Sequence, residues 1–147
     1  MAGEAASEFR FKVDVQVRFR DLDARGHVNN AVYLTYFEIA RLALWAEVSG
    51  SLRLEDREMI VAEITCSYKS PALFNEVLEV WVAPVAIRRT SFILHYRINE
   101  RATGRLIATG RNVQVAFDYT ANRPTPVWPE LRAGLEAAAG RPLGPEE

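Results

Sequence analysis

The chain has 147 residues, of which 49% are apolar and 25% are charged, and its formal net charge is -1. This length suits one globular domain spanning residues 1–147, and the near-neutral balance gives no reason to expect binding to nucleic acid or to a membrane surface. The single cysteine, Cys66, excludes an internal disulfide and a cysteine-based metal cluster.

The N-terminal part of the chain is predicted to hold one strand and one long helix. Residues 1–12 lack the apolar core of a signal peptide, and no segment approaches the ~18 apolar residues of a membrane span, so we expect a cytoplasmic protein. Strict alternation of apolar and polar residues over positions 11–19 predicts a half-buried strand. Residues 30–48 are apolar on nearly all sides, which predicts a buried helix capped by Asn29 or Asn30.

The rest of the chain is predicted to be mainly strands, over residues 60–69, 76–87, 91–98 and 106–118. In the first of these, alternation places five side chains on one face: Ile60, Ala62, Ile64, Cys66 and Tyr68. Pro84 indicates a sheet edge or a bulge, because proline has no N–H to donate. A short helix is expected after Pro129, and the tail from about residue 130 is expected to be flexible.

The order of these elements limits the fold. The last four strands are joined by short turns, which make sequence neighbours antiparallel. No second layer of helices is available to cover the sheet. The sequence therefore predicts an α+β fold in which one curved antiparallel sheet wraps around one long central helix.

A polar loop stands directly before the long helix, and it resembles a known family. Its sequence from Asp21 to Asn30, DLDARGHVNN, followed by Tyr33 and YFEIAR, is similar to the motif of hotdog-fold acyl-CoA thioesterases, in the 4-hydroxybenzoyl-CoA thioesterase-like branch. The later stretches SYKSPALFNEVLEV and RRTSF fit the same branch, so the resemblance covers residues 11–118. It implies the hotdog fold, an acyl-CoA substrate, and a homodimer or homotetramer with active sites at the subunit interface.

The resemblance also assigns roles within the loop. The family's catalytic carboxylate falls on Asp23, and the backbone N–H that faces the thioester carbonyl falls at or near Asn30. Asp23 would attack the carbonyl or deprotonate a water, and the alternative is that it only orders the loop through backbone hydrogen bonds. No G-x-S-x-G motif is present to supply a serine nucleophile instead.

Other residues of the loop and helix each have more than one candidate role. His27 is a candidate for proton transfer, or it holds the loop in place. Gly26 permits a close backbone approach or a positive φ, and Asn29 caps the helix or holds a water molecule. Asp21 is expected to order the loop. Glu38 is a rival base, because a helix carboxylate performs catalysis in another hotdog branch, and otherwise it pairs with Arg41.

Substrate binding and cofactors complete the expectations. The phosphates of coenzyme A (CoA) require cations, for which Lys69, Arg88 and Arg89 are candidates, and Tyr33 is a candidate to line the acyl tunnel or belongs to the core. No metal-ligand spacing occurs, so we expect no metal and no cofactor beyond the CoA of the substrate. The alternatives are an acyl carrier protein (ACP) thioesterase, a hydratase of the same fold, and a non-catalytic acyl-CoA-binding protein.

Overall fold

The structure is a computed structural model that describes residues 8–49 and 57–146. Its helices and strands are, in chain order, β1 (Phe11–Gln16), the 3-10 turn η1 (Phe19–Asp21), α2 (Val32–Ser49), β2 (Arg57–Tyr68), β3 (Val77–Ile87), β4 (Ser91–Glu100), β5 (Leu106–Asp118), β6 (Arg123–Pro124) and α3 (Pro129–Ala139). This is the predicted order with two additions, η1 and β6. The strands form an antiparallel sheet in the order β1-β3-β4-β5-β2, and β6 pairs with β5.

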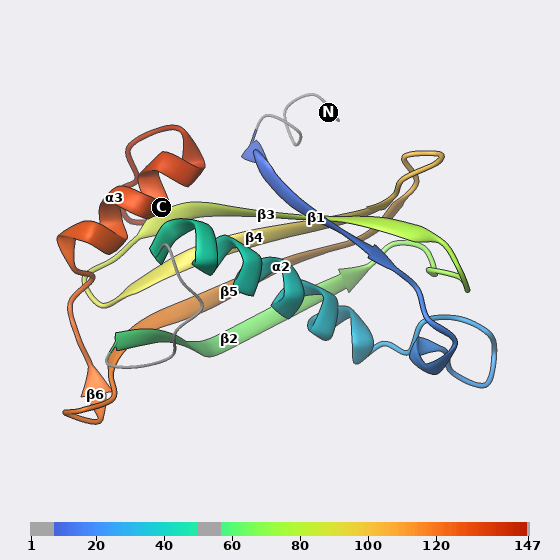
Figure 1. Cartoon of the computed structure of the whole chain (residues 1–147), viewed down its shortest axis with the longest axis horizontal. Helices are drawn as coiled ribbons and strands as arrows, with labels where there is room; N and C mark the ends of the chain where they lie inside the picture. The colour runs from blue at the N-terminus through green and yellow to red at the C-terminus, as the bar shows by residue number, and fades with distance from the viewer. Residues whose placement is uncertain (1–7, 50–56, 147) are drawn as a thin grey trace.

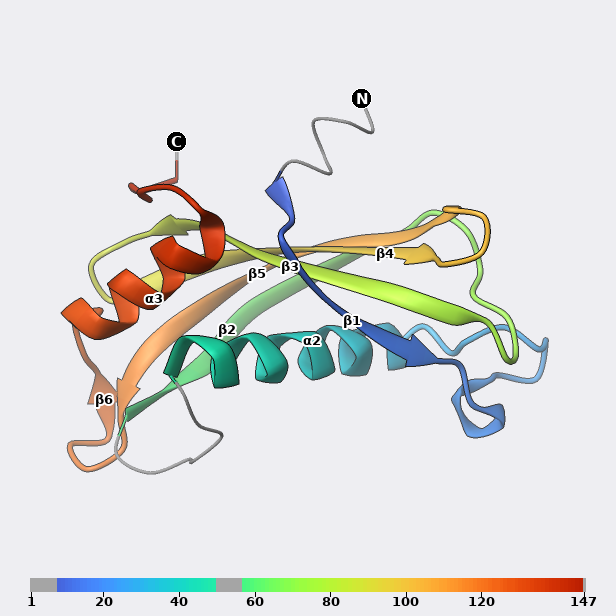
Figure 2. The same ribbon diagram turned by 45° about the horizontal axis from the view of Figure 1, so that its top comes forward.

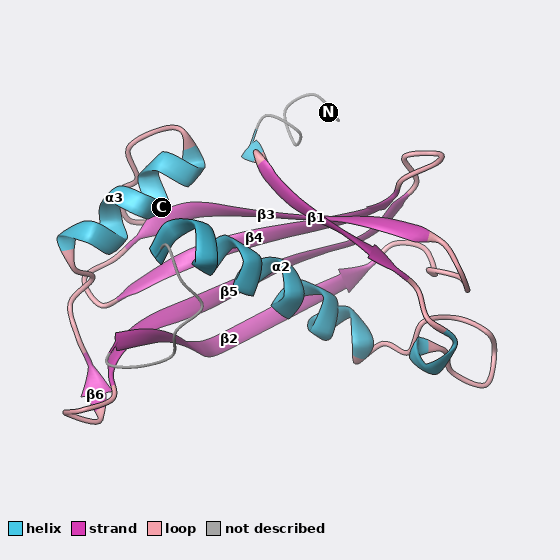
Figure 3. Ribbon diagram, in the orientation of Figure 1, coloured by secondary structure: helices cyan, strands magenta, loops and turns pink. Residues whose placement is uncertain are grey.

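The long helix α2 lies across one face of this sheet (Figures 1 and 3), and the turned view shows the strands on one side of it (Figure 2). The helix packs on β3, α3 and β1, and its residues Phe37 and Ala40 are fully buried, with Phe37 stacked on Tyr96 of β4. Gly110 of β5 permits a close approach, because a Cβ atom there would lie 2.5 Å from Cε2 of Phe37. The predicted arrangement of a sheet around a long helix is confirmed.

The prediction that α2 is buried on nearly all sides is wrong for the single chain. Ile39, Leu42 and Leu34 are 42%, 40% and 36% exposed, so one side of the helix remains open to solvent. α2 contacts β3 and β1 at one edge of the sheet, whereas Val61 and Tyr68 of the opposite edge strand, β2, are 39% and 50% exposed. Apolar residues in the sequence indicate that a surface is suited to burial, but they do not say which partner buries it.

Two bulges change which side chains share a face. Pro84 lies at a register shift in the pairing of β3 with β4, as predicted. A second shift between Val61 and Glu63 makes Ala62 the extra residue in β2. Val61 consequently pairs with the buried Gln114 on the inner face. The predicted common face from residue 60 to residue 68 is therefore wrong, because the alternation changes phase at Ala62.

The C-terminal segment packs against the sheet, whereas the sequence predicted a flexible tail. Leu131 and Leu135 of α3 are buried, and so is Leu143 beyond the helix. The backbone N–H of Ile87 donates to the Gly144 carbonyl at 2.9 Å, which fixes this segment beside the end of β3. These apolar side chains supply the contacts that hold the segment in place. No helix among the described residues is long and apolar enough to cross a membrane.

Candidate active site

The loop before α2 folds back on itself as a short antiparallel ladder. The Asn29 N–H donates to the Asp21 carbonyl at 2.9 Å, and the Asp23 N–H donates to the His27 carbonyl at 2.7 Å. Gly26 closes the turn with φ of +82°, a conformation that side chains disfavour, and its N–H donates to the Asp23 carbonyl at 3.1 Å. The expected positive φ at Gly26 is confirmed. The loop is therefore held by its own backbone.

Asp23 is the exposed carboxylate of this loop. Its Oδ1 accepts the backbone N–H groups of Arg25 at 2.8 Å and of His27 at 3.2 Å. These two donors lower the pKa of the Asp23 carboxyl below its ordinary value, and the hydrogen bond from Arg25 has the larger effect. Its Oδ2 has no hydrogen-bond partner in residues 8–49 and 57–146. The carboxylate is thus ionised. Its Oδ1 is fixed by hydrogen bonds, and its Oδ2 is available to a substrate or a water molecule.

Asp21 has a different environment although it stands only two positions earlier. It is buried, and its carboxylate accepts hydrogen bonds from the Arg18 side chain at 2.9 Å and from the Tyr36 hydroxyl at 2.8 Å. Burial alone would raise the pKa of Asp21, but the hydrogen bonds from Arg18 and Tyr36 bring it below its ordinary value. Asp21 therefore ties the loop to α2, in agreement with its expected role.

The N-terminal end of α2 presents a free backbone donor. The Asn29 side chain accepts the Ala31 N–H at 2.9 Å, and the Asn29 carbonyl accepts the Val32 N–H at the same distance, so Asn29 is the capping residue. The Asn30 N–H has no partner among the residues that the structure describes. It lies at the positive end of the helix dipole, where a negatively charged oxygen is stabilised.

Aromatic residues connect this helix end to the sheet. The Tyr68 hydroxyl donates to the Asn30 carbonyl at 2.9 Å, which places the end of the edge strand β2 beside the helix terminus. Tyr33 is 3% exposed, and its hydroxyl accepts the Ala72 N–H at 3.1 Å, so in the single chain Tyr33 belongs to the core. A contact of Tyr33 with an acyl group stays a prediction.

The remaining predicted residues of this region are exposed. His27 forms a β-bridge with Leu73, and its ring has no hydrogen-bond partner in the described part of the chain. Glu38 lies on the open side of α2, 4.0 Å from Arg41, which matches the predicted i,i+3 pair. A role for either residue in proton transfer stays a prediction.

The predicted phosphate-binding cations do not lie together in one chain. Lys69 follows β2 at the end that holds Tyr68 and Asn30. Arg88 and Arg89 form the turn between β3 and β4, at the opposite end of the sheet (Figure 1). β3 has 11 residues between the two ends, a span of roughly 35 Å at the usual rise of a strand. Their role in binding CoA stays a prediction.

The structure also reveals exposed residues at the Asp23 end that the sequence analysis missed. The side chains of Arg20 and Arg25 are exposed and have no side-chain partner in the described ranges. Phe19 is 78% exposed and packs edge-on against Phe74, with ring centroids 6.1 Å apart. Their place in the sequence could have indicated them: Phe19 and Arg20 directly precede the aspartate motif, and Arg25 lies within it.

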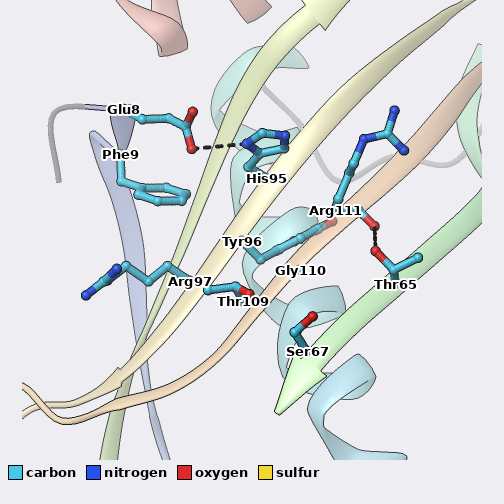
Figure 4. Close-up of a pocket in the computed structure, with 10 residues that line it drawn as sticks. All are labelled: Glu8, Phe9, Thr65, Ser67, His95, Tyr96, Arg97, Thr109, Gly110 and Arg111. Carbon is cyan, nitrogen blue, oxygen red and sulfur yellow. Dashed lines mark hydrogen bonds and ion pairs between the residues drawn. The ribbon is translucent and has the colours of Figure 1, made fainter. Parts of the chain in front are cut away.

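A separate cavity of about 350 Å³ opens on the sheet face that points away from α2 (Figure 4). Its lining includes His95, which lies 3.1 Å from Glu8, and Arg111 of the neighbouring strand. None of the loop residues from Asp21 to Asn30 lines it. No group of three His, Cys, Asp or Glu side chains within residues 8–49 and 57–146 is arranged to hold a metal ion. The expected absence of a metal stays a prediction.

An antiparallel sheet around one long helix is the hotdog fold, which solved thioesterase structures share. Residues 17–135 match the thioesterase-like superfamily, and the chain belongs to this family.

Relatives and solved structures agree with this assignment. The uncharacterized protein YsmA of Bacillus subtilis (strain 168) is 30% identical over 112 residues, which cover 76% of each chain. The long-chain acyl-CoA thioesterase FadM of Escherichia coli (strain K12) is 27% identical over 130 residues, covering 85% of this chain and 96% of FadM. A thioesterase of Thermus thermophilus, crystallised with coenzyme A and Zn, is 35% identical with a TM-score of 0.84, over 92% of this chain and 98% of that one.

Proposed function

We propose that the chain hydrolyses the thioester bond of an acyl-CoA, releasing a carboxylic acid and CoA. Asp23 would supply the reactive carboxylate, and the Asn30 N–H would donate to the carbonyl oxygen. One observation carries this proposal: the loop holds an ionised carboxylate with one oxygen unbonded, and the start of α2, which follows the loop, presents the Asn30 N–H, which is unpaired among the described residues. The likeness to FadM and to the CoA-bound Thermus thermophilus thioesterase supports acyl-CoA as the substrate.

The chemistry needs a group that adds to the carbonyl carbon and a donor for the oxygen. In one route, Oδ2 of Asp23 bonds to the acyl carbon, the C–S bond breaks to release the CoA thiolate, and water hydrolyses the resulting anhydride. In the other route, Asp23 accepts a proton from the water that attacks. Negative charge develops on the carbonyl oxygen in both, and one backbone donor at that position is worth about 3 kcal/mol in enzymes where such a donor has been removed.

Isotope labelling distinguishes these two routes. During turnover in water enriched in ¹⁸O, hydrolysis of an anhydride at its Asp23 carbonyl would place the label in the protein, and mass spectrometry of the peptide holding Asp23 would detect it. Direct attack by water labels only the released acid.

We further propose that two copies of the chain pair through β2 as a homodimer, or as a homotetramer built from such dimers. β2 is an edge of the sheet, so its outer backbone groups are available to a second strand. If the two β2 strands pair antiparallel around a two-fold axis, opposite ends of the two sheets lie side by side. Arg88 and Arg89 of one subunit would then approach the Asp23 end of the other, which explains how residues separated along β3 can serve one site.

Complementation tests this arrangement. The Asp23→Asn chain and an Arg88→Gln, Arg89→Gln chain each lack one half of the proposed site. When the two chains carry different tags and the mixed dimer is isolated, we expect about half the wild-type rate at low acyl-CoA, since one of two sites is complete. Activity no higher than that of the parent homodimers would contradict a shared site, and light scattering distinguishes a dimer from a tetramer.

A thiol-release assay separates the alternative functions. We expect release of CoA from acyl-CoA at a higher kcat/KM than release of ACP from acyl-ACP. A hydratase would act on an enoyl-CoA without releasing thiol, and a non-catalytic protein would bind acyl-CoA and release nothing. The structure gives less support to a hydratase, because the His27 ring has no carboxylate partner among the described residues.

A further inference from the structure

The C-terminal segment delivers a carboxylate to the end of the sheet opposite Asp23. Leu143 is buried, its N–H donates to the Glu136 carboxylate at 2.8 Å, and its carbonyl accepts from Arg132 at 3.0 Å. Gly144 is tied to Ile87 through the backbone. The segment is therefore fixed immediately before Glu146, and the position of that side chain follows from the fold.

Glu146 lies between Arg88 of the β3–β4 turn and Arg111 of β5. Its Oε1 is 3.2 Å from Arg88 and also accepts from a terminal nitrogen of Arg111, while its Oε2 accepts from Nε of Arg111 at 3.0 Å. Arg111 thus holds the carboxylate with two parallel N–H groups, the same geometry by which arginine binds phosphate oxygens. The Arg111 hydrogen bonds also lower the pKa of Glu146, so the carboxylate is charged at neutral pH.

Open space adjoins this pair on both sides. A cavity of about 570 Å³ lies beside Glu146, and its lining includes Arg141 and His95. His95 also lines the cavity of about 350 Å³, together with Arg111 and Arg97. Figure 4 shows His95 and Arg111 projecting from neighbouring strands on this face, away from α2. A ligand larger than a simple ion therefore has room to reach the two arginines.

From these contacts we infer that Arg88 and Arg111 bind phosphate groups of the nucleotide portion of CoA, and that Glu146 occupies their site in the free protein. The inference rests on the proposed function and adds Arg111 and Glu146 to it. Glu146 would then be an internal competitor, which the phosphates must displace before the nucleotide is held. Phosphate carries more charge than a carboxylate and offers more acceptor oxygens, so the exchange favours CoA once it is present.

Substrates with and without the nucleotide test this inference. An acyl-CoA, the matching acyl-dephospho-CoA and the matching acyl-pantetheine share the thioester but differ in phosphates. The measured quantity is the ratio of kcat/KM for acyl-CoA to kcat/KM for acyl-pantetheine. We expect Glu146→Gln to raise this ratio about 2–5-fold, the range expected for an exposed ion pair, and Arg111→Gln to lower it about 5–10-fold.

Matched controls keep the test decisive. Glu130→Gln removes an exposed carboxylate from α3 that makes no ion pair with Arg88 or Arg111 among the described residues, and it should leave the ratio at its wild-type value. Circular dichroism melting checks that Arg111→Gln, which also loses a 3.4 Å contact with Glu63, remains folded. An unchanged ratio in both the Glu146 and Arg111 variants would overturn the inference.

Failure of the proposed function gives a different result. If the wild-type chain turns over no acyl-CoA, calorimetry with CoA and with pantetheine alone still tests the phosphate site. Tighter binding of CoA to Glu146→Gln than to wild type, with no such change for pantetheine, would support the site. Equal CoA affinity in the two proteins would reject it.

Discussion

The two ends of the sheet each present a carboxylate, and they hold it by different means. At one end, the backbone N–H groups of Arg25 and His27 orient Asp23. At the other end, the guanidinium groups of Arg88 and Arg111 surround Glu146. Amides orient a charge without cancelling it, whereas arginines neutralise it and occupy both of its oxygens. The difference indicates that the first arrangement suits a reactive group, and the second a position that an anionic ligand can take over.

Replacing the carboxylate that amides orient should have the largest effect. We expect Asp23→Asn to lower kcat/KM for acyl-CoA roughly 10²–10⁴-fold, because an amide neither attacks a thioester readily nor accepts a proton from water. The thiol-release assay measures the loss, and urea unfolding serves as the control for folding. A rate within about threefold of wild type would refute the role of Asp23.

Asp21 lies in the same loop as Asp23 and can be compared with it, because side chains of an arginine and a tyrosine hold Asp21 whereas backbone N–H groups hold Asp23. Asp21→Asn should lower the free energy of unfolding by about 1–3 kcal/mol, because it disrupts buried hydrogen bonds to Arg18 and Tyr36. The lowered pKa of Asp21 means that its contribution is present above about pH 4 and is lost as the pH falls through the folded value. Urea midpoints at pH 7, 5, 4 and 3 measure both effects. Equal stability of the two proteins at every pH would argue against this role.

The pH dependence of activity sharpens the description of Asp23. Because the pKa of its carboxyl is below the ordinary value of 3.8, the group stays ionised throughout the mildly acidic range. We expect kcat/KM to be flat from about pH 7 to about pH 5 with respect to this group. Rates normalised to the folded fraction measure the profile. An acidic limb centred near pH 6 would indicate that a group other than Asp23 controls the reaction.

The turn beneath Asp23 should have the smallest effect. Gly26→Ala places a side chain at φ of +82°, which costs about 1–2 kcal/mol although no neighbouring atom lies within 4 Å of the added carbon. We expect this modest loss in urea unfolding and a reduced kcat, because the His27 N–H that orients Asp23 comes from the same turn. Gly104→Ala, at a φ of +76° in the β4–β5 turn, is the matched control and should lower stability alone.

The order of helices and strands could be predicted from the sequence because each strand alternates and each turn is short. β3 and β5 match the predicted strands to within one residue. The bulge at Ala62 could not be predicted, because one extra residue changes the phase of β2 without changing its composition. The exposed side of α2, with Leu34 and Ile39, is likewise hidden from the sequence of a single chain.

In the candidate site, contacts between residues close in sequence could be predicted, and contacts between distant residues could not. The bonds that shape the Asp23 loop close within a few residues, so the motif itself contains them. The contact of Arg111 with Glu146 spans 35 residues and depends on how α3 docks, which no local pattern encodes. Arg88 was a candidate from the sequence, but its distance from Asp23 in one chain became visible only in the folded sheet.

The missing side chain at Gly110 carries a consequence for enzyme engineering. An added carbon at that position would collide with the Phe37 ring, which stacks on Tyr96, and would approach the Thr65 carbonyl to 3.1 Å, so the ring, or the helix that carries it, would have to shift. A shift of the helix would also move the Asn30 N–H at its N-terminal end, although no residue near the thioester had been changed. Efforts to change the acyl preference should therefore leave Gly110 unchanged, because Phe37 of α2 packs against it.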